Sequence, residues 1–88
     1  MINFKQEELS LNLFKQLQAR FPDIELVSID ESPIYPDNIW ISVVMPKEDD
    51  RYIELRELSA EISTDILLDY GYHISTISGR RQQAGAVA

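Results

Sequence analysis

The stretch PDNIWISVVMP, residues 36–46, decides the fold class of this chain. β-Branched residues dominate it and a proline stands at each end, which is typical of a strand bounded by loops. Its two faces hold different sets of side chains: Ile39, Ile41 and Val43 on one, and Trp40, Ser42 and Val44 on the other. We therefore predict a strand over residues 38–45 with both of its faces at least half buried.

Two helices are predicted on either side of this stretch. The first covers residues 4–21, where leucines recur every four residues from Leu9 to Leu17. Asn3 and Gln6 form a capping box at its start, and Pro22 ends it because the residue before a proline avoids the helical region. The second helix covers residues 51–69, with Asp49 or Asp50 as its N-cap and Gly71 just past its end.

Two further strands complete the expected sheet. Residues 24–30 alternate regularly between two faces, and residues 72–78 also have the pattern of a strand. The order α-β-β-α-β predicts a two-layer α/β (α+β) sandwich, in which a small mixed three-stranded sheet carries both helices on one face. We expect a single domain over residues 1–78 and a flexible tail over residues 79–88.

Composition argues against several classes of function. The 88 residues carry a net charge of −7, which disfavours binding to nucleic acid or to an anionic membrane. The chain has no cysteine and a single histidine, so neither thiolate chemistry nor a multi-histidine metal site is expected within it. No apolar run approaches the length of a membrane span, and residues 1–10 lack the apolar block of a signal peptide. These features predict a cytoplasmic protein.

The second helix carries three stripes of side chains where one apolar stripe would suffice. The stripe expected to pack on the sheet comprises Leu55, Leu58, Ile62 and Ile66. The stripe expected to face water comprises Glu54, Glu57, Glu61 and Asp65. The third stripe comprises Ile53, Ala60 and Leu67, which are spaced seven residues apart.

Two interpretations of this third stripe are open. Either the helix over residues 4–21 covers it within the same chain, or it binds another chain; Leu68, an apolar residue among the acidic ones, favours the second. A chain this small also cannot cover both faces of its sheet, so the sequence predicts a homodimer. The interface candidates are Ile53, Ala60, Leu67, Leu68, Trp40 and Tyr35.

The segments PDNIWISVVMPKEDD and LSAEISTDILLDYGYHIST, in this element order, resemble the small nucleotidyltransferases of the DNA polymerase β-like superfamily over residues 24–78. In that family a Gly-Ser turn follows the first strand, and an Asp-x-Asp pair opens the second and binds magnesium. This chain has VSIDES in place of the turn, and Asn38 and Trp40 occupy the carboxylate positions. An amide and an indole are poor magnesium ligands, so the resemblance implies an inactive member with no catalytic, cofactor-binding or metal-binding residues.

The resemblance implies a non-enzymatic protein-interaction module, antitoxin-like or regulatory, because small nucleotidyltransferases often act as antitoxins beside a helical toxin. One alternative is a small-ligand or nucleotide-binding domain that uses a cleft near Trp40 and Tyr35. A further alternative is a BolA-like or KH-like binding domain, which the element order and the DES of VSIDES resemble, although no GxxG occurs. No cofactor is expected.

Overall fold

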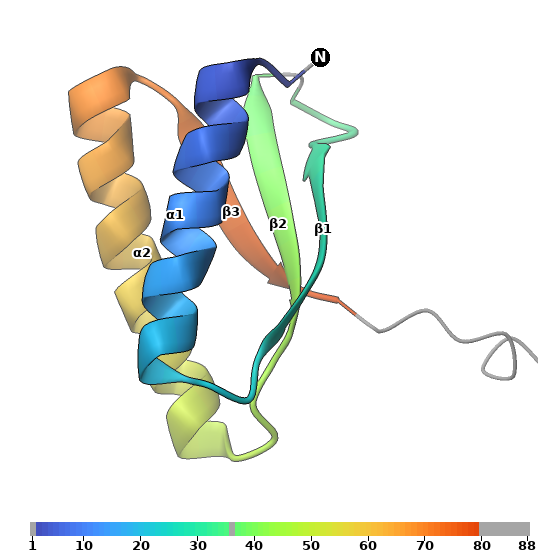
Figure 1. Ribbon diagram of the computed structural model, residues 1–88, viewed down its shortest axis with the longest axis vertical. Helices are drawn as coiled ribbons and strands as arrows, with labels where there is room; N and C mark the ends of the chain where they lie inside the picture. The colour runs from blue at the N-terminus through green and yellow to red at the C-terminus, as the bar shows by residue number, and fades with distance from the viewer. Residues whose placement is uncertain (1, 36, 80–88) are drawn as a thin grey trace, which may run out of the picture.

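The computed structural model describes residues 2–35 and 37–79. Its elements are α1 (Phe4–Arg20), β1 (Glu25–Glu31), β2 (Asn38–Val44), α2 (Asp49–Tyr70) and β3 (His73–Ser78), as Figure 1 shows. The order α-β-β-α-β expected from the sequence is therefore confirmed. The predicted tail lies outside the described residues except for Gly79.

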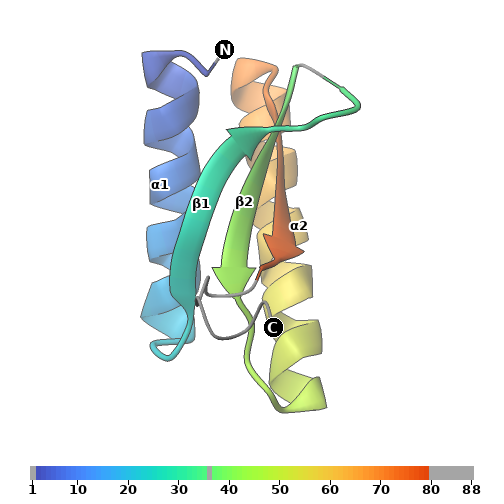
Figure 2. The ribbon, with the colours of Figure 1, turned by 90° about the vertical axis from the view of Figure 1, so that its right-hand side faces the viewer.

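The sheet has the strand order β1-β2-β3. β1 runs antiparallel to β2, and β3 runs parallel to β2, so the sheet is mixed as predicted. Both helices lie on one face of it, and no helix of the described chain covers the other face (Figure 2). β2 is the central strand, which leaves β1 and β3 as the two edges.

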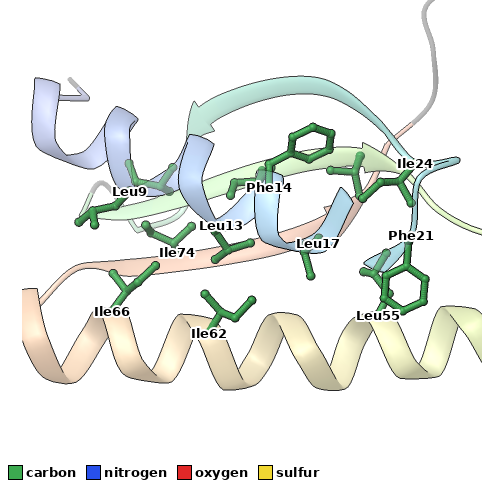
Figure 3. Close-up of a cluster of buried hydrophobic side chains, with 13 residues drawn as sticks. Leu9, Leu13, Phe14, Leu17, Phe21, Ile24, Leu55, Ile62, Ile66 and Ile74 are labelled. Carbon is green, nitrogen blue, oxygen red and sulfur yellow. The ribbon is translucent and has the colours of Figure 1, made fainter. Parts of the chain in front are cut away.

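The core fills the space between the sheet and the two helices (Figure 3). Its fully buried apolar side chains are Leu13, Leu17, Ile24, Ile39, Ile41, Val43 and Leu55. Each such side chain contributes about 1.5–3 kcal/mol through removal from water. The first stripe of α2 packs on the sheet as predicted, although Leu58 at its margin is only partly buried.

Local capping sets the ends of the helices. Asn3 Oδ1 accepts from the Gln6 backbone N–H at 2.7 Å, and Gln6 Oε1 accepts from the Asn3 backbone N–H at 2.9 Å, which confirms the capping box. Gly71 closes α2 with a φ of 78°, a conformation that favours glycine. The N-cap predicted for α2 was wrong: Glu48 holds that position, and Asp49 and Asp50 lie in the first turn, where their charges favour the helix dipole.

The first turn of α2 is tied to the segment that follows α1. The Arg51 guanidinium donates to both carboxylate oxygens of Asp23, and the Nη1–Oδ2 distance is 2.9 Å. Its hydrogen bonds hold the pKa of the Asp23 carboxyl below its ordinary value. The Arg51 side chain also lies over the Phe21 ring, 5.5 Å from its centroid. These contacts fix where α2 begins relative to α1.

β1 departs from the regular alternation predicted for it. Its register with β2 shifts between Leu26 and Ser28, so Val27 is an inserted bulge residue. As a result Leu26 and Ile29, three positions apart, both pair with buried residues of β2 and both pack against the core. The bulge leaves the outer edge of β1 irregular.

The burial of α2 predicts the cost of truncating its side chains. Leu55 is 0% exposed, so Leu55→Ala should destabilise the fold by about 2–5 kcal/mol through lost burial and a residual cavity. Leu68→Ala, the same change on the same helix at a position 77% exposed, should change stability by less than about 0.5 kcal/mol. Urea unfolding measures both, and equal effects would contradict this account of the core.

Candidate functional site

The third stripe of α2 is not covered by α1. Ile53 is 54% exposed, Ala60 is exposed, and Leu67 is half-buried. α1 packs against β1 and β2, so it runs along the opposite flank of α2, where Arg20 Nη2 lies 3.9 Å from Glu54 Oε2. The interpretation in which α1 buries this stripe is therefore wrong. The acidic stripe is exposed as predicted, but it lies on the flank next to α1.

Two hollows lie between α2 and the edge strand β3. Their volumes are about 170 Å³ and about 250 Å³, and Ala60, Ser63, Ile74 and Ser75 line both, so they are parts of one groove. We call it the α2–β3 groove. Its lining residues are Arg56, Ser59, Ala60, Ser63, Thr64, Leu67, His73, Ile74, Ser75 and Thr76. Small side chains on α2 leave the space beside β3 open.

Side-chain hydrogen bonds hold α2 against β3 at one end of this groove. Ser59 Oγ donates to Thr76 Oγ1 at 2.6 Å, and both residues are buried. Arg56 Nη1 donates to the Thr76 carbonyl oxygen at 3.2 Å. Because Thr76 is bound twice by neighbouring turns of α2, the position of the helix over the edge strand is fixed.

β3 has a strand partner on one side only. In a parallel pair, alternate residues direct their backbone groups to the same side. The Gly79 N–H donates to the Val43 carbonyl at 2.8 Å, so the odd-numbered residues of β3 face β2, and Ile74 and Thr76 face outward. Within residues 2–35 and 37–79 no strand lies beside the outward N–H groups of Ile74 and Thr76, whereas the outward carbonyl of Thr76 already accepts from Arg56 Nη1. These two groups are available to another strand.

The two edges of the sheet are protected to different extents. β1 carries the bulge at Val27 and three acidic residues, Glu25, Asp30 and Glu31, and such features discourage the addition of another strand. β3, with the sequence HISTIS, contains no acid, no lysine or arginine and no proline, and its register with β2 is regular. The β3 edge is therefore the one open to strand addition.

The groove is also separated from most of the negative charge. The acidic stripe of α2 lies on the other flank of that helix, and the carboxylates of β1 lie at the far edge of the sheet. The residues that line the groove include no Asp or Glu, and Arg56 is the only Lys or Arg among them. A chain with a net charge of −7 thus presents a nearly neutral surface at this edge.

The structure separates the predicted interface residues into different regions. Ile53, Ala60 and Leu67 follow the exposed flank of α2 that borders the groove. Leu68 is 77% exposed, but its position in the acidic stripe places it on the other flank. The first three therefore belong to one surface, and Leu68 does not share it.

Trp40 and Tyr35 occupy two further regions. Trp40 is half-buried on the sheet face that carries no helix, where it pairs with Asp30 of β1 and Ser75 of β3. Tyr35 is 63% exposed in the loop between β1 and β2. Neither residue lines the α2–β3 groove or the hollow between α1 and α2 that Arg20 and Glu54 line, so a ligand cleft between them rests on the sequence alone.

Neither a metal-binding cluster nor a membrane-spanning helix is found in the described part of the chain. Among residues 2–35 and 37–79, no group of three or more His, Cys, Asp or Glu side chains is arranged to hold a metal ion. Neither of the two helices there combines the length and the hydropathy needed to span a membrane.

Comparison with known proteins found no match to this chain. No family model matches the chain, and no curated protein or solved structure matches it. The resemblance to nucleotidyltransferases therefore stays a prediction from the sequence, as do the BolA-like and KH-like alternatives.

The Ser59–Thr76 hydrogen bond predicts a measurable coupling between α2 and β3. Thr76→Val keeps the shape of the side chain but leaves the buried Ser59 hydroxyl without its acceptor, which should cost about 1–3 kcal/mol. The double variant Ser59→Ala/Thr76→Val should lose less than the sum of the single variants, by about 1 kcal/mol. Chemical denaturation of the four proteins gives this coupling.

The matched control is Thr64→Val, the same change at an exposed position of α2. It should alter the free energy of unfolding by less than about 0.5 kcal/mol. A coupling of zero between Ser59 and Thr76 would show that this bond does not hold the helix against the strand.

Proposed function

We propose that this chain is a non-catalytic domain that binds another protein chain through the α2–β3 groove and the outer edge of β3. The contrast between the two sheet edges carries the proposal. β1 carries a bulge and acidic residues, whereas β3 is regular, contains no Asp, Glu, Lys or Arg and is bordered by an open groove. Addition of a strand to an exposed sheet edge is a general mode of protein recognition.

The edge offers both backbone and side-chain interactions to a partner. An added strand would satisfy the outward N–H groups of Ile74 and Thr76, and each hydrogen bond contributes about 0.5–1.5 kcal/mol net. Every second side chain of that strand would point towards the groove next to Ala60. Ile53 and Leu67 add apolar surface, which is worth roughly 25 cal/mol per Å² when it is buried.

The non-catalytic part of the proposal rests on the residues at the two carboxylate positions of the resembled family. Asn38 and Trp40 stand there, and neither side chain is a good magnesium ligand. An inactive nucleotidyltransferase-like domain with an antitoxin-like or regulatory role is the form that the resemblance suggests. The absence of cysteine supports a cytoplasmic location, and the net charge of −7 argues against a nucleic-acid partner.

Site-specific photo-crosslinking tests this proposal. A photoreactive benzoylphenylalanine replaces Thr64, an exposed residue that lines the groove, and the chain is irradiated in its native cells. We expect one predominant covalent adduct with a protein, because the groove is the binding surface. Mass spectrometry of the adduct then identifies the bound chain and its site of attachment.

The control places the same photoreactive residue at Ala19, an exposed position of α1. The proposal predicts little or no adduct from that position. Equal yields from the two positions, or no protein adduct from position 64, would show that the groove is not a binding surface.

A further inference from the structure

The third stripe of α2 is symmetric about its central residue. Ile53 precedes Ala60 by seven residues and Leu67 follows it by seven, which is close to two helical turns in each direction. If two antiparallel α2 helices cross at Ala60, each Ile53 meets the partner subunit's Leu67. The two alanines meet each other at the crossing, where small side chains allow the helix axes to approach. The stripe is therefore complementary to a second copy of itself.

β3 can share the same symmetry axis. Ala60 and Ser75 both line the two hollows of the groove, so Ser75 lies beside Ala60 along the edge strand. Antiparallel pairing of two β3 strands centred on Ser75 would bring Ile74 opposite the partner subunit's Thr76, and the reverse. These are the residues whose backbone groups face outward. A single two-fold axis therefore allows the third stripes of the two α2 helices to pack together while the two β3 strands pair.

The charges along α2 are compatible with this contact. With the axis at Ala60, Arg56 lies level with the partner subunit's Thr64, and Glu57 lies level with the partner subunit's Ser63. Neither Arg56 nor Glu57 therefore lies opposite a residue of the same charge. The contact avoids the repulsion that two chains of net charge −7 would otherwise experience. The acidic stripe stays on the flank next to α1, away from the axis.

We infer that the chain bound at this surface is a second copy of the same chain, which refines the proposed function and rests on it. In the resulting dimer, the two three-stranded sheets join through β3 into one sheet of six strands. Both outer edges are then formed by β1, the strand that carries the bulge and the acidic residues. The assembly closes at two copies because no open edge remains for a third.

Sedimentation equilibrium of the full chain, from high micromolar to nanomolar concentration, tests the dimer. At the top of this range the wild type should have twice the 10.2 kDa mass of one chain. Ala60→Glu sets a carboxylate against its own copy at the axis and should weaken association by on the order of 100-fold or more. Ala19→Glu, the same change at an exposed position of α1, should leave association unchanged.

Single cysteines test the strand register, because the chain has none of its own. A non-hydrogen-bonded antiparallel pair has its Cα atoms about 4.5 Å apart, within the range of a disulfide. Ser75→Cys should therefore form a covalent dimer under mild oxidation. Ile77→Cys, on the same face of β3, would lie about 14 Å from its own copy and should not.

Three results would overturn the inference: a wild type of single-chain mass at the highest concentration, a dimer that Ala60→Glu does not weaken, or failure of Ser75→Cys to crosslink. The proposed function fails separately, because it requires only a protein adduct at position 64. A monomeric chain that crosslinks there to a different protein would keep the proposed function and exclude the second copy.

Discussion

β3 is held by a parallel ladder from β2 on one side and by two side-chain hydrogen bonds to Thr76 from α2. The parallel pairing requires the chain to return along the whole sheet between β2 and β3, and α2 makes that return. The bonds from Arg56 and Ser59 then fix the helix over the edge strand. α1 packs over β1 and β2, on the other side of α2 from β3. The flank of α2 that borders the groove therefore stays uncovered. The groove follows from this arrangement.

Most of the fold could be predicted because its signals are local. The β-branched residues of PDNIWISVVMP indicate a strand, and Asn3, Gln6 and Gly71 mark helix ends by their own side-chain or backbone chemistry. The bulge at Val27 has no comparable signal, because no glycine or proline marks it and β2 imposes it through pairing. The flank of α2 against which α1 packs could not be predicted from the sequence either, because it depends on which strands α1 covers.

The candidate site was predictable only in part. The spacing of Ile53, Ala60 and Leu67 identified the stripe, but its two interpretations could not be separated before the strand order was known. Ser59, Ser63 and Thr76 gave no signal, because small polar residues are common on exposed surfaces and their meeting depends on the tertiary fold. One signal was present and unused: HISTIS lacks the charges that ELVSIDE carries, and that difference distinguishes an open edge from a protected one.

Amide hydrogen exchange in β3, measured residue by residue at two protein concentrations, tests most directly whether its outer edge receives a strand of a second copy. The account predicts that the N–H groups of Ile74 and Thr76 exchange quickly in dilute solution and slowly in concentrated solution. The inward N–H groups of Ser75 and Ile77, which face β2, should exchange slowly at both concentrations. Rates for Ile74 and Thr76 that do not change with concentration would contradict the account.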